Sequence, residues 1–352
     1  MWQLGSIIPK DIELVIPGNI GFFEILLVIS FLLHILFVNI TVGSSSLAVF
    51  QEIKGIVKKD KKYDNLAFQL ATHASIMKSI AVVIGVAPLL IISVIYTQYF
   101  YPSTLLIGKA WLSLIILLIA AFLILYLYKF SWDKMGGGKK KLHVLIGATG
   151  SLLLLFVPLI FIVNVVSMLY PEMWEGSKGF FHGLVYYPQI WQRYFHFILA
   201  SFAVAGFYLY FWNARAERKI ADRAGMTKEE KAEVVKDGKK FGVKVMLWTT
   251  LLQLVAGTVL LMSFERDIMM LYMGDSALLT GLLIGSIFIT LLLSFFLYLL
   301  LKHDKRKYFI LSMTTFVLVL GLMGWMRHEL RESYLEPYKA DNVRTTSIEV
   351  SE

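Results

Sequence analysis

Eight long apolar stretches constrain the fold of this chain more than any other feature of its sequence. Each is roughly 20 residues or longer, which is the length that an α-helix needs to cross a bilayer. Because lipid offers no hydrogen bonds to the backbone, such stretches cross as helices. The sequence therefore predicts an all-α fold, a polytopic membrane bundle of about eight transmembrane helices. The expected spans are approximately residues 21–50, 71–98, 104–128, 142–169, 189–212, 243–264, 277–301 and 308–326.

The polar links between these spans alternate in charge. Four links, at residues 51–70, 129–141, 213–244 and 302–307, hold 24 of the 34 lysines and arginines. Cytoplasmic links of membrane proteins carry the basic excess, so we expect these four in the cytoplasm and both termini outside. The net charge of +9 then faces anionic lipid, and no nucleic-acid partner is needed to explain it.

The expected topology divides the chain into three segments. Residues 1–20 lack a basic n-region and a small-residue cleavage site, so we expect them to remain as an outer N-terminal segment. Residues 21–326 are expected to form the transmembrane helical domain, and residues 327–352 a polar outer tail. The chain as a whole is expected to be a multi-pass protein of the cytoplasmic (inner) membrane. It has no cysteine, which excludes disulfides, iron–sulfur clusters and covalent c-type haem attachment.

The apolar stretch from Pro188 to Trp212 contains two ionisable residues, Arg193 and His196. Such residues are costly in hydrocarbon and by default mark a functional site facing the bundle interior. Small residues follow His196 at helical spacing, namely Ala200, Ala203 and Gly206. Small side chains let a flat group or a neighbouring helix come close. A buried haem held by His196 and a histidine bonded to another helix both fit this pattern.

His34 has a similar setting, because its neighbours are mostly apolar for ten positions on either side, with Glu24 as the only charged residue and Asn39 as the only amide. It enters from the same outer side as His196, and we expect it to lie deeper. A haem ligand and a hydrogen-bonded core histidine are both possible interpretations.

Other histidines lie nearer the membrane surfaces. His73 is expected at the inner boundary, where an ordinary interfacial histidine is the alternative to a cofactor contact. His143 follows a lysine run and is expected to be solvated. His328 and Glu329 lie together at the outer end of the last span.

Three motifs resemble subunit I of cytochrome bd quinol oxidases. HILFVNITVG from His34 resembles that subunit's first-helix motif, H-x-L-F-V-P-L-T-x-G, with Asn39 at the proline. RYFHFILASFAVAG from Arg193 resembles the fifth-helix motif R-F-x-H-x-x-x-A, which carries a b-haem ligand. GWMRHE, ending at Glu329, resembles G-W-x-x-x-E, whose glutamate serves a second b haem. The order and the helix placement of all three motifs agree.

The resemblance implies a set of haem contacts and cofactors. His34 would be the axial ligand at the site that binds haem d in the oxidases, and His196 would ligate the low-spin b haem. Glu329 would stand at the remaining b haem. Two or three non-covalent b haems are therefore expected, and a quinone is a further candidate cofactor. Three more residues are candidates for cofactor binding, namely Arg193, His73 and His328.

The chain also departs from that family's pattern. The span 277–301 lacks the methionine expected as second ligand to the low-spin haem, and the link 265–276 is too short for the external quinol loop. No aspartate or glutamate occurs between Ala71 and Tyr128, where the family has carboxylates for oxygen reduction and proton delivery. After Glu329, residues 331–335 read RESYL in place of G-R-Q-P-W.

These departures shape the functional hypothesis. Reduction of dioxygen to water consumes protons, and a buried site needs a relay of titratable groups to deliver them. We therefore favour a quinol-linked oxidoreductase whose b haems pass electrons from the quinol pool to an external c-type cytochrome or another redox subunit on the outer face. A terminal quinol oxidase that reduces dioxygen is the alternative. A haem-free transporter or assembly subunit is an alternative of another class.

Overall fold

The computed structural model describes residues 18–135, 139–216 and 227–339, and within them the chain is helical and contains no β-strand. In this described part of the chain, eight helices are long and apolar enough to cross a membrane, which confirms the predicted all-α bundle. These helices are α1 (Ile20–Lys58), α2 (Lys61–Ile95), α4 (Gly108–Phe130), α5 (Lys140–Leu169), α7 (Ile190–Ala216), α8 (Lys228–Met262), α10 (Ala277–His303) and α11 (Arg306–Lys339). The short helices are α3 (Thr97–Leu106), η2 (Pro171–Met173), α6 (Phe180–Tyr186), α9 (Arg266–Met270) and the π-helical turn η3 (Leu271–Asp275).

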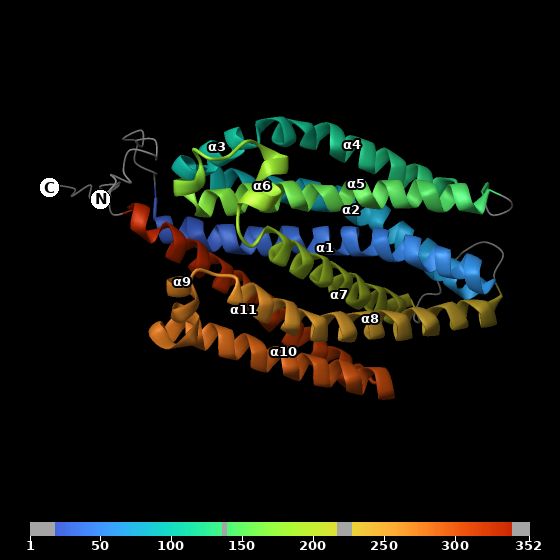
Figure 1. Ribbon diagram of the computed structural model, residues 1–352. Helices are drawn as coiled ribbons and strands as arrows, with labels where there is room; N and C mark the ends of the chain where they lie inside the picture. The colour runs from blue at the N-terminus through green and yellow to red at the C-terminus, as the bar shows by residue number, and fades with distance from the viewer. Residues whose placement is uncertain (1–17, 136–138, 217–226, 340–352) are drawn as a thin grey trace.

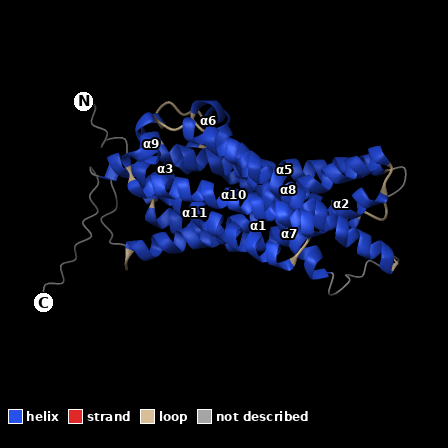
Figure 2. Cartoon of the chain, turned by 90° about the horizontal axis from the view of Figure 1, so that it is seen from below, coloured by secondary structure: helices blue, strands red, loops and turns tan. Residues whose placement is uncertain are grey.

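The long helices form two groups that meet along α1 and α7 (Figure 1). Helices α1, α2, α4 and α5 make one group, and α7, α8, α10 and α11 make the other. The short helices α3, α6 and α9 all lie at one end of the bundle, which we call the α6 end (Figure 2). The α1–α2 turn and the start of α8 lie at the opposite end, which we call the basic end. The four links rich in lysine and arginine therefore share one end, as the charge pattern predicts.

At the basic end, several helices continue beyond the predicted spans. Helix α1 runs to Lys58, and Lys59 takes the left-handed conformation with φ 52° that ends it. The side chain of Asp60 then caps α2 by accepting a hydrogen bond from the backbone of Lys62. Helix α8 starts with a capping box between Thr227 and Glu230. Caps of this kind satisfy the free backbone N–H groups of a first turn. The basic link at 51–70 and the described residues of the link at 213–244 are therefore largely helical.

Small residues set the closest contact between α7 and α8. A Cβ added at Gly206 would lie 2.6 Å from the carbonyl oxygen of Gly242, and one added at Gly242 would clash with Gly206 in turn. The two backbones therefore touch, as small residues at membrane helix crossings allow. At Gly206, the small-residue groove below His196 is filled by a neighbouring helix and not by a flat cofactor.

Helix α11 continues past Arg327, where the polar tail was expected to begin, and reaches Lys339. Its last turns pack into the bundle, since Tyr334 and Leu335 are buried among residues from other helices. The remaining parts of the expected N-terminal segment and tail, residues 1–17 and 340–352, lie outside the described residues.

Candidate functional site

His34 is held on α1 in one definite tautomer. Its Nδ1 lies 2.9 Å from the backbone carbonyl oxygen of Ala81 on α2. A carbonyl oxygen only accepts hydrogen bonds, so Nδ1 carries the proton and Nε2 of the neutral ring keeps its lone pair. The ring packs against Gly85, where an added Cβ would come within 2.5 Å of His34 Cε1. A histidine that ligates a metal through one ring nitrogen is usually oriented by a hydrogen bond from the other ring nitrogen. His34 already makes such a bond through Nδ1.

His196 lies on α7 at the same level as His34. Asn39 Oδ1 accepts a hydrogen bond of 3.0 Å from Ser201 Oγ, and each histidine lies five residues from its member of this pair, toward the α6 end. At the helical rise, both are about 8 Å from the bridge. The expectation that His34 lies deeper is therefore wrong, because α7 begins closer to this bridge than α1 does.

The ring of His196 has an uncommitted nitrogen. Its Nδ1 is buried and has no hydrogen-bond partner in the protein. On α8, a Cβ added at Gly257 would lie 3.9 Å from His196 Cε1, so the facing helix leaves room beside the ring. Buried ring nitrogens are nearly always bonded to something, and a metal ion is one partner that suits an imidazole.

Arg193 is fixed by a residue with an unusual backbone. Gln189, just before α7, has φ 64°, a left-handed conformation that is rare for a residue with a side chain. Its Oε1 accepts hydrogen bonds from Arg193 Nη2 (2.6 Å) and Nε (3.2 Å). Its Nε2 lies 2.7 Å from Tyr170 Oη and 2.9 Å from Tyr334 Oη, so it donates to the two phenols. This buried network joins the start of α7 to α11 and the end of α5.

Two more guanidinium groups converge near Arg193. Arg327 and Arg331 of α11 line the same small cavity, and apolar side chains of α2, α5 and α11 complete its wall. Part of this charge is balanced, because Arg331 Nη2 donates to His328 Nδ1 (2.8 Å) and Nε lies 3.9 Å from a Glu332 oxygen. Three like charges around one apolar cavity are best stabilised by an anion, and guanidinium groups suit carboxylates in particular.

At the α6 end, His328 and Glu329 also lie close to this arginine group. His328 is buried, and its Nε2 lies 4.0 Å from Glu24 of α1. Glu24, His328 and Glu332 offer ligand atoms within 4.8 Å of one another. However, the donor group of Arg331 faces His328 Nδ1, so Nε2 carries the proton of the neutral ring and does not offer a lone pair. Glu329 is half-buried beside Tyr272 of η3.

The connecting segments at the α6 end hold groups that titrate outside the spans. Partial desolvation, together with the neighbouring Glu172 carboxylate, raises the pKa of Glu265, while hydrogen bonding with Tyr170 acts in the opposite direction. Burial also raises the pKa of Tyr170, so its phenol stays protonated and available as a donor. Glu172 accepts a hydrogen bond from Tyr338.

His73 lies apart from the other candidates. It is buried in the basic half of the bundle, and both of its ring nitrogens lack a hydrogen-bond partner. Its ring packs edge-on against Tyr208 and Trp212 of α7, at centroid distances of 5.0 and 5.1 Å. His73 therefore faces a neighbouring helix, and its place at the inner membrane boundary stays a prediction.

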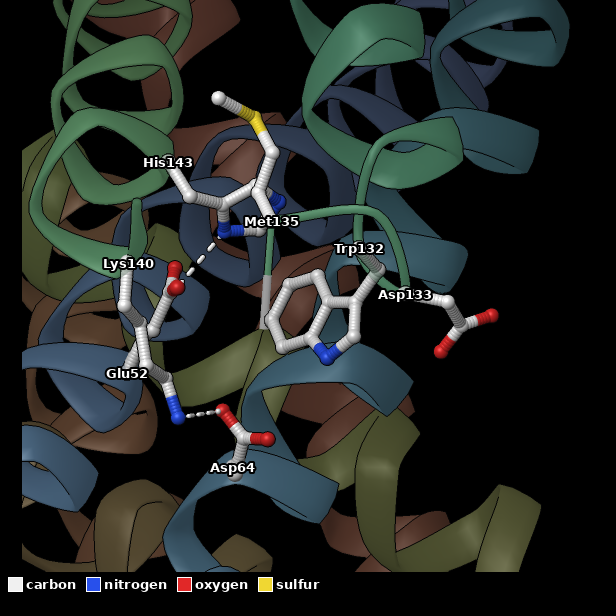
Figure 3. A pocket seen from close by; sticks show the side chains of 7 residues that line it. All are labelled: Glu52, Asp64, Trp132, Asp133, Met135, Lys140 and His143. Carbon is white, nitrogen blue, oxygen red and sulfur yellow. Dashed lines mark hydrogen bonds and ion pairs between the residues drawn. The ribbon is translucent and has the colours of Figure 1, made fainter. Parts of the chain in front are cut away.

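A second polar centre escaped the sequence analysis. Glu52 of α1 and His143 of α5 are bonded together at the basic end (Figure 3). Tyr128 of α4 donates a further hydrogen bond to Glu52. His143 was expected to be solvated, yet its side chain is only 2% exposed. Three lysines precede it in sequence, whereas in the fold it is bonded to Glu52, 91 residues away.

The donor groups of the α6 half fit a b haem. His34 presents Nε2 with Nδ1 already bonded, His196 has an uncommitted Nδ1, and the three arginines provide charge for propionate carboxylates. Two methionines that precede the span 277–301, Met262 and Met273, are 73% and 61% exposed, which does not suit a buried second ligand.

Comparison with known families decides the class of the chain. Residues 25–265 match the profile of the family described as cytochrome bd terminal oxidase subunit I. This chain belongs to the cytochrome bd terminal oxidase subunit I family. The matched region of this bd-family protein includes His34, His73, Arg193 and His196, whereas α10 and α11 lie outside it.

The fold of this bd-family chain is also similar to that of a solved relative. The structure of bd oxidase from Geobacillus thermodenitrificans superimposes with a TM-score of 0.57 at 14% sequence identity, covering 92% of this chain and 86% of the other. Among curated proteins, none matches the sequence. This bd-family chain is a multi-pass membrane protein with a respiratory, haem-based, quinol oxidase-like role, which favours the redox class over a haem-free transporter.

Proposed function

We propose that this protein holds b haems at His34, His196 and Glu329, takes electrons from quinol at the α6 end, and passes them to a redox partner on the outer face. The hydrogen bond from His34 Nδ1 to Ala81 is the observation that carries this proposal. It fixes the tautomer in which Nε2 is free to bind iron. Bound haem would supply reversible one-electron chemistry.

The residues around the arginine group have complementary roles in this proposal. Arg193, oriented by Gln189, and Arg327 provide positive charge for propionates in a site with little water. Charge-assisted hydrogen bonds of this type are about twice as strong as neutral ones. Glu329, beside Tyr272, would stand at a further b haem.

Quinol oxidation at the α6 end requires an acceptor for its protons. Glu265 has a raised pKa, which brings a carboxylate closer to the range of an efficient general base. Tyr170 and Gln189 offer a hydroxyl and an amide beside it for bonding to a quinol oxygen. With the α6 end outside, the protons leave directly to water. The other charged residues that are candidates for the quinol site at the α6 end are Glu172, Glu175, Asp267, Arg327 and Glu329.

The electron acceptor is proposed to be a c-type cytochrome or another redox subunit outside the membrane. The motive is the stretch from Ala71 to Tyr128, which has no carboxylate to relay protons to a buried oxygen site. Reduction of dioxygen by this chain is the second candidate, and membership in a family of terminal oxidases favours it.

An oxygen electrode separates the two candidates. Purified protein is first characterised by its reduced-minus-oxidised spectrum and by pyridine haemochrome quantitation, and then given a reduced quinol with and without an added c-type cytochrome. We expect haem reduction, electron transfer to the cytochrome and slow oxygen uptake in its absence. Rapid oxygen uptake without the cytochrome would establish the oxidase instead. A preparation without a Soret band would refute both candidates.

A further inference from the structure

Lys78 of α2 is a charged residue in the apolar middle of the helix group formed by α1, α2, α4 and α5. It is the only lysine, arginine, aspartate or glutamate within residues 25–51, 65–95, 110–128 and 144–169, the middle parts of these four helices. An ionisable residue within a membrane helix is costly, so by default it indicates a functional site. The role of this lysine therefore has to be sought in its surroundings.

The side chain of Lys78 is enclosed by protein and faces aromatic rings. It is 1% exposed, and its Nζ has no hydrogen-bond partner within the described part of the chain. The ring centroids of Tyr126 and Phe122 on α4 lie 3.1 and 4.7 Å from Nζ. A cation is attracted to the face of an aromatic ring, and more strongly where water is excluded. The two rings therefore stabilise the ammonium form of Lys78 between α2 and α4.

The positive charge of Lys78 is not balanced by a carboxylate in the middle of these helices. The stretch from Ala71 to Tyr128 contains no aspartate or glutamate. On α1, Glu52 lies about 27 Å from His34 at the helical rise and is already bonded to His143. The absence of nearby acidic residues, which argues against a proton relay, thus also leaves one buried positive charge uncompensated.

Lys78 lies close to the residues that hold His34. Lys78, Ala81 and Gly85 recur at i, i+3 and i+7, which places them on one face of α2. The carbonyl oxygen of Ala81 lies 2.9 Å from His34 Nδ1, and Gly85 packs against the same ring. Three residues of helix correspond to a rise of about 4.5 Å. The face of α2 that supports the proposed haem ligand therefore also carries the buried ammonium group.

We propose that the ammonium group of Lys78 raises the midpoint potential of the haem held by His34. The inference deepens the proposed function and rests on it, because it requires a haem at His34. An electron that arrives there adds a negative charge to the protein interior, and a fixed positive charge nearby stabilises it. One electron passes from the reductant to ferric iron, no covalent bond breaks, and Lys78 keeps its proton.

Coulomb's law gives the size of the expected effect. A unit charge about 12 Å from the added electron, at an effective dielectric constant of about 20, changes the reduction equilibrium roughly tenfold. For a one-electron couple, a tenfold change corresponds to about 59 mV. The effect should be largest at His34, because Lys78 shares a helix face with the residues that hold it, whereas His196 faces Gly257 of α8.

Helix packing alone does not explain a lysine at this position. Methionine is flexible and apolar, and it would fill space between α2 and α4 without the cost of burying an ammonium group. Loss of a purely structural lysine would change the stability of the protein and leave the potential of the haem where it is. The midpoint potential therefore separates an electrostatic role from a structural one.

The test is a spectroelectrochemical redox titration of the haem-loaded protein. The absorbing component that is lost in His34→Ala identifies the haem at His34. Lys78→Met removes the charge and should lower the midpoint potential of that component by about 59 mV, which is a tenfold weaker affinity for the electron. Lys78→Arg keeps the charge and should keep the potential near the wild-type value. Pyridine haemochrome quantitation reports the haem content of each variant.

Matched variants control for the change of side chain. Lys61→Met makes the same substitution at an exposed residue of α2 and should leave the potential unchanged, because water screens that charge. Tyr126→Phe keeps the ring that faces Nζ and should also leave the potential unchanged. Lys78→Gln is a second neutral variant if Lys78→Met does not fold.

The outcomes distinguish this inference from the proposed function. Wild-type potentials in both Lys78→Met and Lys78→Gln, or an equal shift in Lys61→Met or Tyr126→Phe, would overturn the role of the ammonium group. A potential as low in Lys78→Arg as in Lys78→Met would do the same. Wild-type protein without haem would refute the proposed function instead. Because the titration uses artificial mediators, a failure of quinol oxidation leaves it unaffected.

Discussion

Asn39 of α1 and Ser201 of α7 are joined by a buried hydrogen bond of 3.0 Å that links the two helices carrying His34 and His196. Gly43 allows the close approach, since any Cβ there would clash with the backbone of Ser201. Asn39 stands where the family motif has proline. The departure therefore adds a polar contact between the two helices that carry the proposed haem ligands.

The first prediction concerns this bridge. Ser201→Ala leaves the buried Asn39 amide oxygen without its partner, which costs about 1–3 kcal/mol in unfolding free energy. Asn39→Leu combined with Ser201→Ala removes both partners and should recover part of that loss. A double-mutant cycle by thermal unfolding in detergent measures the coupling. Strict additivity of the two single changes would show that the bond contributes nothing.

The second prediction concerns haem retention. His196→Ala and His34→Ala should each remove one absorbing haem or shift its spectrum, because each deletes a proposed iron ligand. His303→Ala is the control, since that side chain is exposed at the basic end. Haem per protein by pyridine haemochrome, with membrane insertion checked in parallel, gives the readout. Unchanged spectra in both variants would count against the ligand assignment.

Gly85 offers a third test that leaves every ligand in place. Gly85→Ala places a methyl group within 2.5 Å of the His34 ring, so the ring must move and its bond to Ala81 must weaken. We expect a shifted spectrum or partial haem loss. Gly281→Ala is the matched control, because nothing lies within 4 Å of a Cβ there. Identical spectra in the two variants would argue that His34 has no role at the haem.

The fourth prediction concerns pH. The pKa of Glu265 is raised, so on acidification its carboxylate takes up a proton at a higher pH than an ordinary glutamate. The initial rate of haem reduction by a quinol analogue should therefore rise with pH, with its inflection at a pH above 4.5. Glu265→Gln should abolish this rise. For stability the sign is opposite, since a raised carboxyl pKa favours folding at low pH, and this contribution is lost as pH rises.

The fifth prediction concerns topology. Single cysteines are simple to introduce because the natural chain has none. Cysteines at Gly137, in a basic link, and at Ser347, near the C-terminus, should react with impermeant reagents from opposite sides of the membrane. Both positions lie outside the described residues. Labelling of both from the same side would refute the proposed orientation.

The sequence by itself determined the number and order of the spans and the common end of the basic links. Those properties depend on local hydrophobicity and charge, which are readable residue by residue. It also singled out His34, His196 and Arg193, because ionisable residues are rare in apolar stretches. Their motifs lie within single helices, so no tertiary information was needed to propose them.

The tertiary structure decided which side chains meet. It placed His34 and His196 at one level through Asn39 and Ser201, and moved His73 away from them. It also buried His143 against Glu52, although 91 residues separate them and lysines precede His143 in sequence. Burial and pairing depend on how helices pack across the bundle, and packing is a property of distant residues together. A single sequence read along its length therefore cannot reveal the acid–base pair at the basic end.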